Sequence, residues 1–175
     1  MRVAPLGAYF MDDLARAADE ARLSAEVTHM HPEGQAGAIA VAVAAGFASR
    51  HRGQTDALVK DRLFNAVLAH TPQGRTRDGI ATAAGLPLTA SVEMAAVELG
   101  NGSEVTAPDT VPFSLWVVAR HWDDFPKALW SAVSTGGDRD TLGAIVGGIA
   151  VLSASARGIP ERWLAQREPL RATDP

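Results

Sequence analysis

The sequence predicts an all-α fold, and three observations support this prediction. No stretch of the 175 residues alternates apolar and polar side chains for long enough to indicate a β-strand. Proline recurs near the start of apolar, helix-periodic segments, where its missing N–H costs nothing. Alanine and glycine recur at helical spacing in two long tracts, which is typical of closely packed helices. We therefore expect a single helical domain spanning 1–175.

The helix starts are predicted from proline and from acidic N-caps. The prolines expected in or near first turns are Pro32, Pro112, Pro126 and Pro160. Asp109 and either Asp123 or Asp124 precede two of these and are candidate caps. The expected helices span 9–26, 32–50, 54–70, 76–84, 89–99, 109–121, 124–134, 139–156 and 160–166. Loops are expected at 71–75 and in the turn LGNGS at 99–103.

Two of the expected helices carry stripes of small residues. In 32–50 the stripe is Ala36, Ala40, Ala44 and Ala48, beside a bulky one formed by Ile39, Val43 and Phe47. In 139–156 it is Ala144, Gly148 and Leu152, with Gly143 and Gly147 as a second small surface. Glycine within a helix costs about 1 kcal/mol relative to alanine, so close packing has to offset it. We expect 139–156 to be a central helix, buried on nearly all sides.

Composition excludes several classes of protein. There are no cysteines, which excludes disulfides, thiolate zinc sites and cysteine nucleophiles and suits a cytoplasmic location. The net charge is −4 and the basic residues are scattered, so nucleic acid is not an expected partner. The apolar tracts 36–48 and 142–156 fall short of the roughly 20 residues that cross a bilayer. They are expected to be buried helices, and no membrane partner is predicted.

The segment STGGDRDTLG, at 134–143, concentrates oxygen ligands where a Gly-Gly turn meets a helix. Asp138 and Asp140 could simply cap that helix, because carboxylates suit free N–H groups and the positive end of the helix dipole. One cap needs only one carboxylate, however, and the Thr141 hydroxyl stands beside them. Mg²⁺ takes oxygen ligands and uses carboxylates to balance its charge. A magnesium site is the alternative that explains the surplus.

Other candidate ligands are weaker. The pairs Asp12-Asp13 and Asp123-Asp124 are expected to be caps or solvated surfaces. His29 and His31 form a His-x-His pair, which we interpret as polar residues lining a pocket. The remaining histidines lie near expected helix ends and are interpreted as structural; they are His51, His70 and His121. With no nucleophile elbow, P-loop or dinucleotide motif, metal-assisted hydrolysis is the chemistry that remains.

Several segments together resemble one family. GGDRDTLGAIVGGI is similar to the C-terminal metal motif of the ADP-ribosylglycohydrolases, which usually has Thr where Arg139 stands. MRVAPLGAYF, VTHMHPEGQAGAIAVA, VPFSLW and IPERWL resemble further family segments in the same order. The resemblance covers essentially the whole chain. It implies a compact orthogonal helical bundle, incomplete at its N-terminal side, around two Mg²⁺ ions in a cleft for ADP-ribose.

The resemblance also implies roles for individual residues. Asp138, Asp140 and Thr141 match metal ligands, and Asp140 would help to orient the attacking water. His29 matches a histidine of the substrate cleft. The MRVAPLG segment matches a loop that contacts ribose and phosphates, where Gly7 would let the backbone approach the ligand. The implied reaction is hydrolysis of the glycosidic bond between ADP-ribose and a modified acceptor.

The sequence departs from the family pattern in one respect. Family members carry, upstream of the segment that matches Met1, an acidic residue and a Thr-Asp-Asp motif that supplies other metal ligands, and no Thr-Asp-Asp occurs in this sequence. The chain is thus expected to be the C-terminal part of such an enzyme. Three hypotheses follow: a hydrolase completed by a separate N-terminal half chain, a truncated non-catalytic remnant, or a helical interaction protein using the Ala36 to Ala48 stripe.

Overall fold

The computed structural model describes residues 1–56, 58–155 and 158–169, and in these residues it contains ten helices and no strand. The helices are α1 (Ala4–Tyr9), α2 (Leu14–Glu26), α3 (Pro32–Arg50), α4 (Val59–His70), α5 (Arg75–Gly85), α6 (Val92–Leu99), α7 (Ala107–Arg120), α8 (Phe125–Ser134), α9 (Arg139–Ser153) and α10 (Glu161–Gln166). The all-α prediction is confirmed. Two expected helices, 54–70 and 139–156, extend onto residues 57 and 156, which lie outside the described residues.

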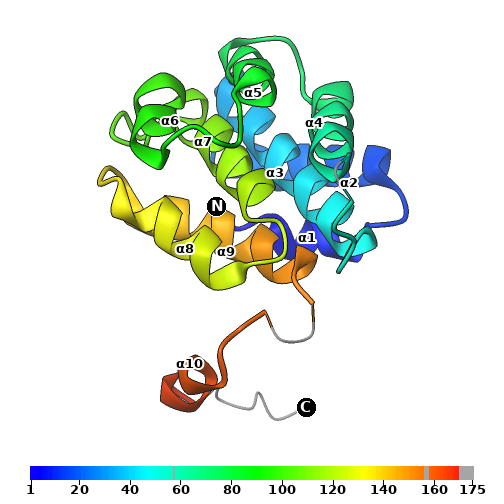
Figure 1. The fold of residues 1–175 in the computed structure, drawn as a ribbon. Helices are drawn as coiled ribbons and strands as arrows, with labels where there is room; N and C mark the ends of the chain where they lie inside the picture. Colours follow the sequence, from blue (N-terminus) through cyan, green and yellow to red (C-terminus); the bar gives the residue numbers. More distant parts are fainter. Residues whose placement is uncertain (57, 156–157, 170–175) are drawn as a thin grey trace.

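Helix α3 is the centre of the bundle, and α1, α2, α4, α5, α7 and α9 all contact it (Figure 1). The four alanines of its predicted stripe are each 3% exposed or less. The closest crossing, however, uses glycine rather than this stripe. A Cβ on Gly7 of α1 would lie 2.0 Å from the Ala42 carbonyl oxygen, and one on Gly46 would lie 2.9 Å from the Gly7 oxygen. The two backbones are therefore in contact, and a side chain at Gly7 or Gly46 would have no room.

The expectation that 139–156 forms the central helix is wrong. Its Ala144 is exposed, and Gly143, Gly147 and Gly148 are only partly buried. Of these glycines, only Gly148 is closely approached, by Ala4 of α1. One side of α9 packs inward against α3, α7 and α8, and the buried residues of that side are Leu142, Ile145, Val146, Ile149 and Ala150. The small residues of α9 thus lie on a side of the helix that is partly exposed to solvent.

Three of the four predicted proline starts agree with the structure. Pro32 and Pro126 lie in the first turns of α3 and α8, and Pro160 immediately precedes α10. Pro112 instead lies inside α7, which begins at Ala107. Its ring packs against Gly79 of α5, where a Cβ would come within 2.7 Å of the ring. The first-turn proline of α7 is Pro108, and Pro112 lies deeper in the helix, where it packs closely against α5.

One of the predicted aspartate caps agrees with the structure, and the other candidates have different partners. Asp124 accepts a hydrogen bond from the Lys127 N–H at the start of α8, as predicted. Asp109 does not cap α7; it lies within its first turn and accepts from the Glu104 N–H over 2.8 Å. Asp123 accepts from the Ser155 N–H over 2.9 Å.

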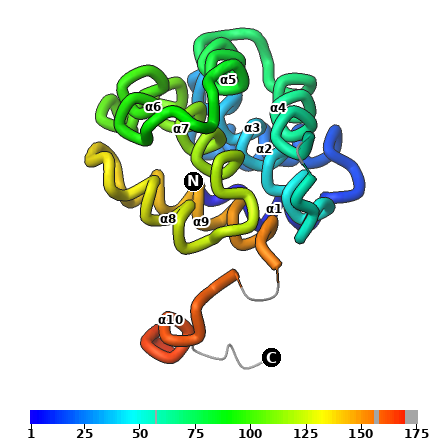
Figure 2. The backbone as a smooth tube through the Cα atoms, viewed as in Figure 1, coloured from blue at the N-terminus to red at the C-terminus, as the bar shows by residue number. Residues whose placement is uncertain are grey.

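The two ends of the described chain lie in different settings. The N-terminus is drawn next to α9 (Figure 2), and α1, which follows it, contacts α2, α3 and α9. Helix α10 lies at the edge, where Trp163 packs against Phe125 and Trp130 of α8 with ring centroids 6.1 and 6.5 Å apart. No helix within residues 1–56, 58–155 and 158–169 combines the length and hydropathy required to cross a membrane.

Candidate functional site

A cavity of about 250 Å³ lies where five segments of the chain meet. Polar residues that follow α2 and that lie at the starts of α7 and α9 line it. Apolar side chains of α3 and residues 1–3 complete the lining. The lining residues are Met1, Arg2, Val3, Ala25, Thr28, His29, Gly34, Gly37, Ala38, Val41, Val105, Thr106, Ala107, Thr110, Val111, Asp138, Thr141 and Ile145. Three residues singled out in the sequence, His29, Asp138 and Thr141, therefore border one cavity.

Asp138 combines a capping role with a place on the cavity wall. It is the N-cap of α9, and its Oδ1 accepts a hydrogen bond from the Thr141 N–H over 3.0 Å. Hydrogen bonds from the hydroxyl and the N–H of Thr141, together with one from the Asp140 N–H, lower the pKa of Asp138. The carboxylate is therefore ionised near neutral pH and suited to bind a cation.

A second glycine-rich turn fixes the backbone before α9. The Asp138 N–H donates to the Asn101 carbonyl over 3.3 Å, and the Asn101 side-chain amide donates to the Thr135 carbonyl over 3.1 Å. Gly137 has φ of 65°, and a Cβ there would lie 2.0 Å from the Asn101 oxygen. The LGNGS turn was predicted as a turn, but its contact with Asp138 was missed. The two segments are more than 30 residues apart, and no local pattern relates them.

Asp140 and Arg139 lie outside the cavity wall. Both side chains are exposed in the first turn of α9, whereas Asp138 is partly buried. Within the described part of the chain, no three histidine, aspartate or glutamate side chains cluster closely enough to hold a metal ion together. The residues present offer a partial oxygen set: the ionised Asp138 carboxylate, the Thr141 hydroxyl and the neighbouring Asp140.

Asp13 accepts from the Arg16 N–H at the start of α2 and is a cap, as expected.

The two histidines of the His-x-His pair have different roles. His29 borders the cavity, its ring lies against Gly34, and its Nδ1 is 2.7 Å from the Thr28 hydroxyl. His31 does not border the cavity. It is the N-cap of α3, where its Nδ1 accepts from the Glu33 N–H over 3.2 Å. The pocket-lining interpretation thus holds for His29 and is wrong for His31.

Gly7 lies away from the cavity wall. The segment expected to be a ligand-contacting loop forms α1, and Gly7 is buried against Ala42 of α3. Packing accounts for the glycine without a ligand. The same segment reaches the cavity instead through its first residues, Met1, Arg2 and Val3.

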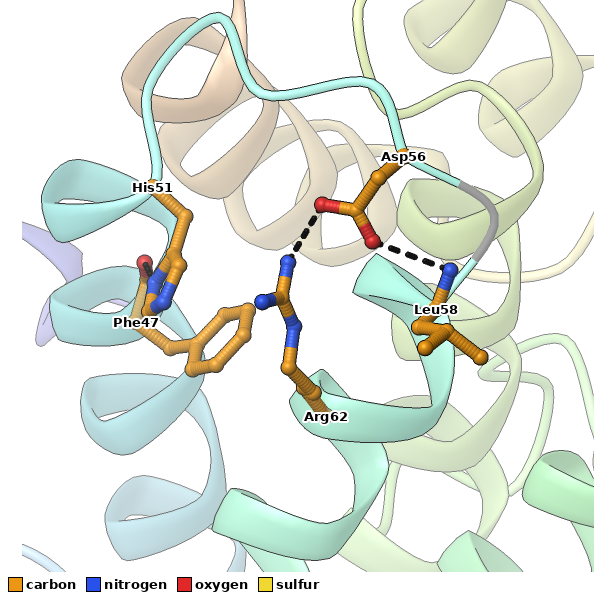
Figure 3. Close-up of polar contacts among 5 residues, drawn as sticks. All are labelled: Phe47, His51, Asp56, Leu58 and Arg62. Atoms are coloured by element: carbon orange, nitrogen blue, oxygen red, sulfur yellow. Dashed lines mark hydrogen bonds and ion pairs between the residues drawn. The ribbon is translucent and has the colours of Figure 1, made fainter.

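The remaining histidines lie at helix ends, as expected. His51 ends α3, stacks on Phe47 with ring centroids 4.0 Å apart, and bonds through Nδ1 to the Phe47 carbonyl over 2.9 Å (Figure 3). Beyond it, Arg62 pairs with Asp56 over 2.5 Å across the loop that joins α3 and α4. His70 is the last residue of α4. His121 ends α7 close to Ser131, and burial, with the nearby Arg120 charge, lowers its pKa.

Val105 also lines the cavity and was not singled out in the sequence. It precedes α7, the residue is 78% exposed, and its φ is 55°. A β-branched residue carries no sequence signal for this conformation, because it is among the least suited to adopt it.

Comparison with known proteins identifies the group to which the chain is related. The family model described as ADP-ribosylglycohydrolase matches residues 1–174. An uncharacterized protein of Archaeoglobus fulgidus is 34% identical over 172 residues, which cover 94% of this chain and 50% of the relative. The chain thus spans about half the length of that relative. No solved structure gives a significant match. Because the family model matches nearly the whole chain, the chain belongs to the ADP-ribosylglycohydrolase family.

Proposed function

We propose that the cavity is part of a magnesium-dependent site that hydrolyses the glycosidic bond between ADP-ribose and a modified acceptor. The observation that carries this proposal is the convergence of Asp138, Thr141 and His29 on one cavity in a member of this family. Asp138 is ionised near neutral pH, and Thr141 adds a second hard oxygen. These donors match the preference of Mg²⁺ for oxygen ligands and charge balance.

Each residue has a distinct role in the proposed site. Asp138 and Thr141 would hold the cation at the start of α9, with Asp140 as a further ligand and a positioning group for the attacking water. Two bound Mg²⁺ ions would acidify that water and stabilise developing negative charge. His29, on the facing wall, would contact the substrate. The Asn101 turn would hold Asp138 in register.

We further propose that the remaining ligands come from a polypeptide that matches the other half of the archaeal relative. Two carboxylates and a hydroxyl leave most of the coordination sphere of a divalent cation open. The relative is about twice as long as the matched region, so it has room for such ligands.

A second candidate function needs no metal. Asp138 already caps α9, and a cap alone explains its hydrogen bonds. In that case the chain would be a non-catalytic remnant or a helical interaction protein.

Calorimetric titration distinguishes these possibilities. ADP-ribose is titrated into the chain with and without Mg²⁺, and into Asp138→Asn and Asp13→Asn. Asparagine caps helices as well as aspartate does, so both variants keep their caps while each loses one charge. We expect binding that requires Mg²⁺, at least tenfold weaker in Asp138→Asn and unchanged in Asp13→Asn. Absence of binding to the unmodified chain, or equal binding by both variants, would contradict the proposal.

A further inference from the structure

Val105 has the only positive φ among the non-glycine residues that the structure describes. At φ of 55° the Cβ of an L-residue crowds its own backbone, and two further substituents on Cβ add to this crowding. Such conformations persist only where the surroundings impose them, and they gather at binding sites. The strain at Val105 therefore needs an explanation.

Burial does not provide it. Three other valines that line the same cavity, Val3, Val41 and Val111, are each 4% exposed or less. Val105 itself is 78% exposed and gains little from packing within this chain. A glycine or an asparagine would fit this backbone with less strain.

The loop that carries Val105 is fastened at both ends. At one end Asn101 bonds to both Thr135 and Asp138. At the other, Asp109 of α7 accepts from the Glu104 N–H over 2.8 Å through its carboxylate and from the Gly102 N–H over 3.1 Å through its carbonyl. These contacts hold an exposed apolar side chain on the cavity wall that also contains Asp138.

We infer that Val105 is a ligand-contacting residue of this cavity, held in a strained conformation so that its isopropyl group packs against bound ADP-ribose. This inference rests on the proposed function, because it takes ADP-ribose as the ligand. The contact would stabilise the complex by burying apolar surface that is open in the free chain. Val105 would then lower the stability of the free protein and raise its affinity.

The variant Val105→Gly tests both effects in one chain. Glycine relieves the strain, so the melting temperature should rise by about 2–4 °C for a domain of this size. Loss of the isopropyl group should weaken ADP-ribose binding, measured by titration in the presence of Mg²⁺, by about tenfold. A residue with a purely structural role would not change stability and affinity in opposite directions. Val105→Ala keeps a Cβ in the strained position and should lose affinity with little gain in melting temperature.

Val97 provides a matched control, since it is 87% exposed on α6 and does not line the cavity. Val97→Ala should bind ADP-ribose as the unmodified chain does. If Val105→Gly binds ADP-ribose within twofold of the unmodified chain, or melts at a lower temperature than that chain, the inference is overturned and the proposed function stands. Absence of ADP-ribose binding by the unmodified chain overturns both.

Discussion

The N-termini of α5 and α9 both have backbone N–H groups that need an acceptor, and a carboxylate accepts from them in a different way in each case. Each helix follows a glycine of positive φ, and each has a carboxylate whose pKa is lowered by hydrogen bonds to its first turn. At α5 the carboxylate is Glu33 of α3, which accepts from the N–H groups of Arg75 and Thr76 and from the Thr76 hydroxyl. At α9 it is Asp138, whose bonds come from its own turn and which also borders the cavity. One carboxylate is used in joining two helices, and the other remains available to a ligand.

The turn before α9 has little room for a side chain at Gly137. Gly137→Ala places a Cβ 2.0 Å from the Asn101 carbonyl, in a left-handed backbone conformation. The turn has to move, and the bond from the Asp138 N–H to Asn101 is lost. We expect the free energy of unfolding to fall by about 3 kcal/mol, measured by urea denaturation.

The neighbouring glycine separates backbone strain from collision. Gly136 has φ of 77°, but nothing lies within 4 Å of the position that a Cβ would occupy there. Gly136→Ala should therefore lose only about 1 kcal/mol. Equal losses in the two variants would show that the Asn101 turn does not constrain Asp138.

Substitutions of Glu33 test the carboxylate that caps α5. Glu33→Ala removes the acceptor of two backbone N–H groups and one hydroxyl. We expect a loss of about 2 kcal/mol in the free energy of unfolding, since unpaired donors near the helix start are costly. Glu33→Gln keeps one acceptor oxygen and should lose about half as much. A loss below about 0.5 kcal/mol for Glu33→Ala would mean that solvent replaces these bonds fully.

The pH dependence of stability follows from the same carboxylate. Burial opposes ionisation of Glu33, but bonds from Thr76 and Arg75 outweigh it and hold its pKa below the ordinary 4.5. A depressed folded-state pKa stabilises the protein above the unfolded pKa, and this contribution is lost as the pH falls through the folded value. The stability difference between the unmodified chain and Glu33→Gln should therefore be constant from pH 7 to about pH 5 and shrink at lower pH.

Acid denaturation of both chains measures this difference. Their other carboxylates are the same, so the titrations of those groups cancel in the subtraction. A difference that widens as the pH falls would contradict the assigned direction.

The sequence predicts local features of this molecule better than contacts between distant segments. Helix α8 and its Asp124 cap follow from a few adjacent residues and agree with the structure. Helix α1 was missed because six residues that include a proline and a glycine carry little helical periodicity. Glu33 capping α5 was missed because its partners lie more than 40 residues away.

The candidate site divides along the same line. Asp138 and Thr141 were identified from their spacing at the start of a helix, and His29 from its place in a His-x-His pair and from the family resemblance. Asn101 and Val105 were not identified, because their roles depend on the fold of their turn against the start of α9, more than 30 residues further along the chain. Small residues were also misleading for α9. The sequence shows that neighbours come close, but only the structure shows that α1 approaches one glycine, Gly148, while Ala144 faces outward.

Substitutions of Asp138 separate capping from ligand binding at α9. Asp138→Asn keeps a side-chain oxygen for the Thr141 N–H, so the free energy of unfolding should change by less than about 0.5 kcal/mol. Asp138→Ala should lose about 1 kcal/mol, as a missing cap does. Asp13, which caps α2 without bordering the cavity, provides the control, and its two variants should show the same pair of values. The lowered pKa of Asp138 means that its negative charge stabilises the folded chain, so Asp138→Asn should not be more stable than the unmodified chain. A clear gain in stability for Asp138→Asn, but not for Asp13→Asn, would contradict that direction and show that the charge at the start of α9 is a cost in the free protein.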